Sequence, residues 1–385
     1  MSFALLALIC AVAMLGPILS LNDAVHVPVV IGELAVGMGL GSTGLRVIDA
    51  TNPTLSFMAQ IGFALVMFVV GSHVPIREHA MVRGLRKGIL RAVAVGVISV
   101  PLGLLIGSLL GTGHGALYAV LIASSSASIV MPALGGTAVT SPAGLEMLAQ
   151  LAVADASCIV VLPLVLDPAH ALRAAIGAVA VIAVAAVFYG VWWWMNRSGY
   201  RKRLHRLSED RGLAMELRLT LTMLFTLAAI AATMHVSVML AGFAIGLAMA
   251  AVGEPRRISN QAFALTEGFF APIFFVWLGS SLDLRTLASH PQAILLGICL
   301  GAAAVLAHGL MVLSRQPWPI AVSTSAQLGV PVGAAALGTT MGVLRDGEPT
   351  AMLLGALITI TVVTVTSKKV VGLMGAPQAS AATAD

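Results

Sequence analysis

One carboxylate lies in the middle of a long apolar stretch of this sequence. Asp155 is near the centre of residues 145–166, LEMLAQLAVADASCIVVLPLVL, and this stretch contains no Lys or Arg. Apolar surroundings favour the uncharged form of a carboxyl group that has no fixed cation beside it. Such a group can bind a proton and a cation in turn, so we predict an ion-binding role for Asp155. The alternative is an Asp that only hydrogen-bonds to its own helix or to a neighbouring Ser.

Two other apolar stretches are interrupted by hydroxyl side chains and proline. Residues 123–132 read ASSSASIVMP, and residues 323–333 read STSAQLGVPVG. Hydroxyls and prolines in mid-span favour local unwinding, and unwound backbone offers carbonyl oxygens to a cation. We predict two broken helices, with Ser125 and Ser126 as ligands near Asp155 and with Gln327 in a modulatory or access position. The alternative is a pair of ordinary Ser- and Gly-rich packing faces.

Three further ionisable side chains lie within or near apolar stretches. Glu33 and Glu267 are near the ends of their stretches, where a carboxylate can reach water. Each is predicted to line an access route, or else to bond to nearby backbone amides. His308 lies deep in residues 293–314, where an imidazole can titrate near its ordinary pKa of about 6.5. We predict a modulatory role for His308, and the alternative is a neutral His with one hydrogen bond.

The elements that carry these side chains are predicted to cross a membrane. The chain has 385 residues, 59% hydrophobic and 10% charged, with a mean hydropathy of +1.00. A soluble domain is typically about 25% charged, so that class is excluded. Apolar runs of roughly 18 to 25 residues are long enough to cross a bilayer. We predict an all-α polytopic membrane protein with 13 spans near 2–20, 28–46, 55–73, 88–111, 116–134, 145–166, 171–195, 214–234, 236–253, 262–280, 293–314, 319–343 and 350–367.

The remaining sequence features exclude several other classes of protein. Cys10, Cys158 and Cys299 are scattered through apolar runs, which argues against a disulfide framework or a metal site. The first apolar run has no preceding Lys or Arg, so we predict a membrane span rather than a cleaved signal peptide. The sequence shows no metal cluster, nucleophile motif or phosphate-binding loop. We therefore expect neither an enzyme nor a cofactor.

Basic residues predict the orientation of the spans. When the 21 Lys and Arg residues are assigned to alternate sides of the membrane, 17 fall on one side; the others are Arg46, Arg173, Arg285 and Arg345. Basic loops stay in the cytoplasm, so we predict an outside N-terminus and a cytoplasmic C-terminus in the cell (inner) membrane. The pI near 9.5 then reflects topology and not nucleic-acid binding. The basic segment 196–211 is predicted to be a solvated linker, or else to contact lipid headgroups.

With these features, the chain resembles the monovalent cation:proton antiporters, in particular the branch with bacterial sodium/proton and potassium-efflux antiporters. The resemblance covers nearly the whole length. It rests on HVPVVIGE at 26–33, Ile61-Gly62 and FVVG at 68–71, Asp155, and FAPIFF at 270–275 followed by Gly279 and LDL at 282–284. It implies inverted repeats with two crossed broken helices, and exchange of Na⁺ or K⁺ for H⁺ at Asp155.

The resemblance also implies a division of labour within a transmembrane domain at 1–370. A core at about 88–166 and 293–367 would move like an elevator against a dimerisation scaffold at about 1–73 and 214–280. The helix at 171–195 would link them, and 371–385 would form a short disordered tail. The expected assembly is a homodimer in the lipid bilayer.

Departures from the family pattern change the expected mechanism. Electrogenic members carry an acid or Asn before the ion-binding Asp and a Lys in the eleventh span, whereas this chain has Ala154 and His308. Gln327-Leu328-Gly329 replaces an Arg-Gly-Glu-like pattern in the second broken helix. Because both partners of a buried ion pair are missing together, we predict electroneutral exchange. A potassium-efflux exchanger is a second possibility, and an ion channel or non-transporting membrane scaffold of the same fold is the alternative from another class.

Overall fold

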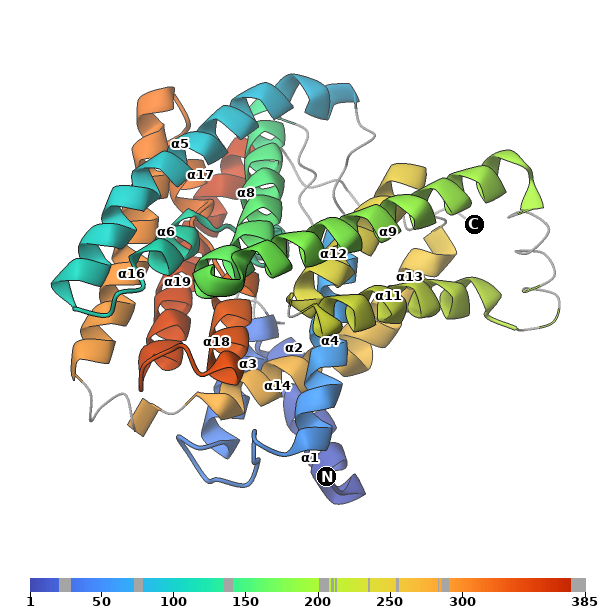
Figure 1. The fold of residues 1–385 in the computed structure, drawn as a ribbon, viewed down its shortest axis with the longest axis horizontal. Helices are drawn as coiled ribbons and strands as arrows, with labels where there is room; N and C mark the ends of the chain where they lie inside the picture. Colours follow the sequence, from blue (N-terminus) through green and yellow to red (C-terminus); the bar gives the residue numbers. More distant parts are fainter. Residues whose placement is uncertain are drawn as a thin grey trace. The chain divides into compact units, whose positions relative to one another are not determined.

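The computed structural model of the chain is helical (Figure 1). It describes residues 1–20, 29–72, 79–134, 141–200, 208, 211, 213–234, 236–253, 256–282, 284–285 and 291–374, and no strand occurs among them. Helices are the expected solution for apolar runs in a bilayer. The hydrocarbon interior offers no hydrogen-bond partners, so each segment must pair its own backbone groups.

The chain divides into two compact units, each built from separate stretches of sequence. Unit 1 consists of Met1–Leu19, Val29–Arg77 and Ile159–Arg285. Unit 2 consists of Ser20–Pro28, Glu78–Cys158 and Thr286–Asp385. The boundary falls within one long helix, so that the first part of this helix, including Asp155, belongs to unit 2.

Unit 1 is held together by close helix crossings at glycines. Its helices are α1 (Phe3–Ala13), α2 (Leu15–Ser20), α3 (Val29–Leu40), α4 (Pro53–Ser72), α9 (Ala171–Arg197), α11 (Met215–Thr233), α12 (Val238–Val252), α13 (Arg256–Leu265), a π-helical turn (Thr266–Phe270) and α14 (Ala271–Ser281). Where α4 meets α12, a Cβ added to Gly246 would collide with Phe68 O. Where α3 meets α14, a Cβ on Gly279 would collide with Leu34 O. Small residues let these backbones approach closely.

Unit 2 contains both Ser-rich stretches that the sequence singles out. Its helices are α5 (His79–Leu109), α6 (Gly115–Ala123), α7 (Ala127–Ala133), α8 (Pro142–Leu166, up to Cys158), α16 (Pro291–Gly309) with a 3₁₀ turn (Leu310–Ser314), α17 (Trp318–Ser323), α18 (Gly329–Met341) and α19 (Glu348–Met374). Helix α5 packs on α6, and α16 packs on α6 and α19. These helices surround the two helix breaks.

Helices occupy every one of the thirteen predicted ranges. Within the described residues, nine helices are long and apolar enough to cross a membrane, and three apolar helices are shorter. The all-α polytopic fold is therefore confirmed, while the number of thirteen crossings stays a prediction. Several boundaries differ: α5 begins at His79 rather than 88, and α3 ends at Leu40 rather than 46.

The last described helix extends further than the predicted last span. Helix α19 continues to Met374, beyond the predicted start of the tail at 371, because its apolar pattern resumes after Lys368 and Lys369. Residues 375–385 lie outside the described part, as do the motif residues 26–28 and 283.

Candidate ion-binding site

The first helix break separates α6 from α7. Residues 124–126 are not helical, and Ser124 has extended backbone with φ −71° and ψ 152°. Three consecutive serines favour this break because their hydroxyls compete with the backbone for hydrogen bonds. Ser124 Oγ donates to Leu121 O at 2.8 Å, which pairs a carbonyl near the end of α6. Ser124, Ser125 and Ser126 are all buried.

The second helix break separates α17 from α18 and uses the same chemistry. Residues 324–328 are not helical. Thr324 Oγ1 donates to Ala321 O at 2.7 Å, and Ser325 Oγ donates to Val322 O at 2.7 Å. In both breaks, therefore, hydroxyls bond to carbonyls three residues earlier. The prediction of two broken helices is confirmed.

The two breaks are joined by a direct hydrogen bond. Ser125 Oγ donates to Thr324 O at 2.8 Å, and both residues are buried. Hydroxyl and carbonyl oxygens from two unwound segments thus lie close together inside unit 2. Oxygens of this kind can replace the hydration shell of a monovalent cation.

Amide and imidazole groups surround the side chain of Thr324. His308 Nδ1 lies 2.9 Å from Thr324 Oγ1, and Gln150 Nε2 donates to the same oxygen at 3.2 Å. Backbone groups of Ile122 and Ser124 also lie near the His308 ring. The hydroxyl of Thr324 is therefore where α8 and α16 meet the second break.

Gln327 connects the second break to two other helices. Its backbone N–H donates to Thr359 Oγ1 on α19 at 3.1 Å, and its Nε2 donates to Ile122 O on α6 at 3.5 Å. These bonds hold residues 324–328 between α6 and α19. The predicted modulatory or access role of Gln327 stays a prediction.

Asp155 lies on α8 in the same unit, and its side chain is buried. Only 2% of Asp155 is exposed, and its Oδ1 has no hydrogen-bond partner among the described residues. A buried polar atom without a partner calls for an explanation, such as a water or an ion that binds there. Asp155 therefore has the burial expected for an ion-binding acid, while its pairing with Ser125 and Ser126 stays a prediction.

Glu33 and Glu267 lie in unit 1 and so do not share a unit with Asp155. Glu33 is buried in α3, whereas Glu267 is exposed in the π-helical turn. The two carboxyl groups are close enough to interact electrostatically. Their predicted access role is not tested by this placement.

Sequence reasoning missed several residues that the structure places around the breaks. Gln150 is a buried amide on the Asp155 helix, and a polar residue in the middle of LAQLAVAD was the available signal. Thr324 lies in the stretch 323–333 that the sequence singles out, whereas Thr359 resembles the many threonines that only bond to their own helix. Gln316 lies at the corner between α16 and α17, and nothing in its local sequence distinguishes it from a loop residue.

The fold and this pair of joined breaks define a class, that of multi-pass membrane proteins with two discontinuous helices in one compact unit. A family model described as "Sodium/hydrogen exchanger, transmembrane" matches residues 5–373. The chain therefore belongs to the sodium/hydrogen exchanger family.

Two relatives are named as cation transporters. The chain is 23% identical over 381 residues to a Bacillus subtilis (strain 168) protein provisionally named Na(+)/H(+) antiporter YjbQ, covering 93% of this chain and 61% of the relative. It is 26% identical over 277 residues to the glutathione-regulated potassium-efflux system protein KefC of Klebsiella pneumoniae (strain 342), covering 69% of this chain and 43% of the relative. The chain thus spans 61% and 43% of the length of these relatives, less than two thirds of each.

Solved structures agree in fold. The sodium proton antiporter MjNhaP1 of Methanocaldococcus jannaschii at pH 8 matches with a TM-score of 0.64 and 15% identity, covering 96% of this chain and 95% of that one. An electron-microscopy structure of MjNhaP1 matches with a TM-score of 0.67 and 16% identity, covering 97% of both chains. At this identity, the likeness establishes the fold alone.

Proposed function

We propose that this protein is a secondary active antiporter that exchanges a monovalent cation, Na⁺ or K⁺, for a proton. The observation that carries the proposal is the hydrogen bond from Ser125 to Thr324 O, which joins two helix breaks in the unit that also holds Asp155. Asp155 would bind the proton and the cation in turn, with Ser125 and Ser126 as neighbouring ligands. Membership of the sodium/hydrogen exchanger family supports this chemistry.

Alternating access would come from movement of one unit past the other. Unit 2 would be the moving core and unit 1 the dimerisation scaffold, with α9 as the link between the predicted core and scaffold. The division of the chain into two compact units supports this assignment. The proposed assembly is a homodimer with its N-terminus outside and its C-terminus in the cytoplasm.

The cycle would be electroneutral, with one proton exchanged for one cation. Ala154 precedes Asp155, and His308 bonds to the neutral hydroxyl of Thr324. A single carboxyl group that binds either a proton or a monovalent cation has the same net charge in both loaded states. Neither loaded form then moves net charge across the membrane.

Ion flux in proteoliposomes tests the proposed function. Purified protein is reconstituted with a pH gradient, and the gradient is followed with a fluorescent dye before and after Na⁺ or K⁺ is supplied on the opposite side. An antiporter dissipates the gradient only when the cation is present. Cation flux that needs no proton exchange would indicate a channel instead, and no flux with either cation would favour a non-transporting scaffold.

A further inference from the structure

Two buried carboxamides form a hydrogen-bonded chain that ends at the second helix break. Gln316 Nε2 donates to Gln150 Oε1 at 2.9 Å, and Gln150 Nε2 donates to Thr324 Oγ1 at 3.2 Å. Gln150 is 0% exposed and Gln316 is 2% exposed. Burying an amide is costly unless it is hydrogen-bonded, so this pair needs a structural or functional reason.

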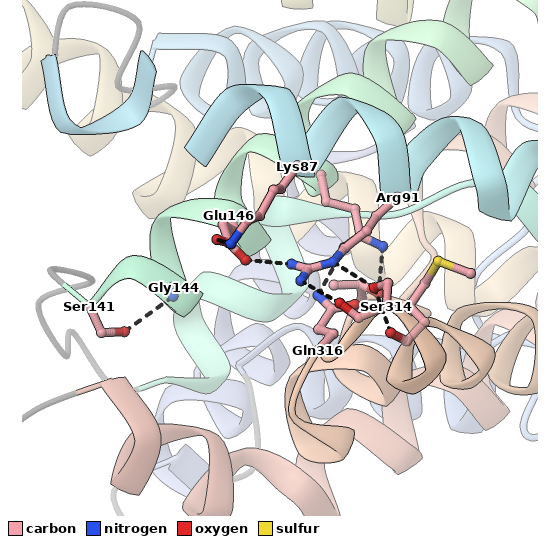
Figure 2. A network of polar contacts seen from close by, with 10 residues as sticks. Lys87, Arg91, Ser141, Gly144, Glu146, Ser314 and Gln316 are labelled. Atoms are coloured by element: carbon pink, nitrogen blue, oxygen red, sulfur yellow. Dashed lines mark hydrogen bonds and ion pairs between the residues drawn. The ribbon is translucent and has the colours of Figure 1, made fainter. Parts of the chain in front are cut away.

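A second set of hydrogen bonds, one turn earlier along α8, connects the same face of this helix to its neighbours. Glu146, four residues before Gln150, accepts hydrogen bonds from Arg91 Nη1 at 2.7 Å and from Lys87 Nζ at 2.8 Å (Figure 2). Arg91 in turn donates a hydrogen bond from its Nε to Ser314 Oγ at 2.9 Å. Residues four apart lie on one helix face, so Glu146 and Gln150 together attach this face of α8 to α5 and to the corner at 314–316.

Helix geometry relates this attachment to Asp155. Asp155 is five residues after Gln150, which corresponds to about 7.5 Å along the axis and about 140° around it. Asp155 therefore does not lie on the face that carries Glu146 and Gln150. The hydrogen bonds of that face nevertheless fix the rotation of α8 about its own axis. At a side-chain radius of about 6 Å, a rotation of about 20° would move the carboxylate by roughly 2 Å.

We propose that Gln150 is a positioning residue that sets the rotation of α8 and thereby the cation selectivity of Asp155. This inference rests on the proposed ion-binding role of Asp155. A displacement of about 2 Å is large compared with the few tenths of an ångström that separate good from poor metal–ligand distances. Loss of the Gln150 bonds should therefore weaken binding of the best-fitting cation more than binding of the others.

The test is the ratio of cation KM values for Gln150→Met, which keeps the length of the side chain but removes both hydrogen bonds. Exchange is measured in proteoliposomes with Li⁺, Na⁺ and K⁺. We expect KM for the preferred cation to rise about tenfold, the KM ratio of the two best cations to change at least threefold, and kcat to change less than twofold. A merely structural role would alter the amount of active protein but not this ratio.

Matched variants make each outcome decisive. Gln316→Met removes the hydrogen bond from Gln316 to Gln150 but leaves the bond from Gln150 to Thr324. It should therefore shift the KM ratio in the same direction as Gln150→Met, but by less. Ser99→Ala removes a buried hydroxyl that bonds within α5, to Val95 O, and should leave the ratio unchanged. If Gln150→Met is not recovered folded, Gln150→Asn, one methylene shorter, replaces it with the same expected direction.

Unchanged KM ratios in the folded Gln150 variants would overturn the positioning role. The proposed function is tested separately by Asp155→Asn. If Asp155→Asn is inactive while Gln150→Met has wild-type ratios, only the positioning role fails. If Asp155→Asn transports like wild type, the proposed ion site itself fails.

Discussion

At the scale of the residue, Asp155 combines two properties that rarely occur together. It lies inside an apolar helix, and its Oδ1 has no partner among the described residues. An acidic side chain at such depth costs at least about 2.5 kcal/mol on insertion scales, so its presence favours a functional role. The other buried acids on described side chains, Glu33, Glu216 and Glu348, lie nearer the ends of apolar stretches.

We predict that Asp155→Asn abolishes cation:proton exchange without preventing insertion or folding. Asn keeps the size of the side chain, but it cannot take up and release a proton, and a neutral amide is less costly in the bilayer. Exchange in proteoliposomes measures the loss, and size-exclusion chromatography of the purified variant measures folding. Wild-type exchange rates in the variant would contradict the proposed mechanism.

We also predict that His308→Gln retains exchange but moves the acid side of its pH profile. In the wild type, a charged His308 would compete with the cation for the same negative charge, so acidification would inhibit through His308 as well as through protonation of Asp155. Gln can still bond to Thr324 but cannot become charged, so inhibition at low pH should be weaker or shifted. Exchange rates between about pH 4 and 9 measure this, and a profile identical to wild type over that whole range, or complete inactivity, would contradict it.

At the scale of the element, local chemistry and close packing have different consequences. Hydroxyls end α6 and α17 by bonding to carbonyls three residues earlier. Glycines instead set the distance between α4 and α12 in unit 1, where Gly246 lies against the backbone of Phe68. A break therefore tolerates changes that keep a hydroxyl, whereas the crossing tolerates no added side-chain atom.

We predict that Gly246→Ala destabilises the protein by about 1–3 kcal/mol, as overpacking of a tight core does. The added Cβ would collide with Phe68 O, a backbone atom that cannot move without shifting α4. Gly190→Ala on α9 is the matched control, since a Cβ there meets no atom within 4 Å. Thermal unfolding in detergent should show a lower midpoint for Gly246→Ala, and an unchanged or higher midpoint for Gly190→Ala. Equal midpoints in the two variants would contradict a packing role for Gly246.

At the scale of the whole molecule, the proposed cycle makes transport independent of membrane voltage. One carboxyl group carries either one proton or one monovalent cation, so both loaded forms carry the same charge. We predict that a membrane potential set by a gradient of a permeant anion such as thiocyanate, imposed on Na⁺-containing vesicles without pH, Na⁺ or K⁺ gradients, drives no Na⁺ uptake. A protonophore-insensitive uptake driven by the potential would show an electrogenic cycle. Reconstituted Ala154→Asp with His308→Lys is an informative comparison, since it restores a second acid and a fixed cation.

The sequence by itself determined the class of fold and the residue types of the candidate site. Apolar runs long enough to cross a bilayer require helices, and hydroxyls in mid-helix weaken the helical hydrogen bonding of the backbone. The helices and the helix breaks can therefore both be predicted from the spacing of residue types. The burial of Asp155 and the two breaks at 124–126 and 324–328 followed from the same local signals.

Only the tertiary structure decided which of these residues meet. The bond from Ser125 to Thr324 O and the chain from Gln316 through Gln150 join residues far apart in sequence. Likewise, Glu33 and Glu267 fall in a different unit from Asp155, although their sequence signals are similar. Local patterns report the preferences of one segment, whereas these contacts depend on how helices from distant stretches cross. The physical reason is that side-chain hydrogen bonds extend only about 3 Å, so they form only after packing has set the distance between the helices.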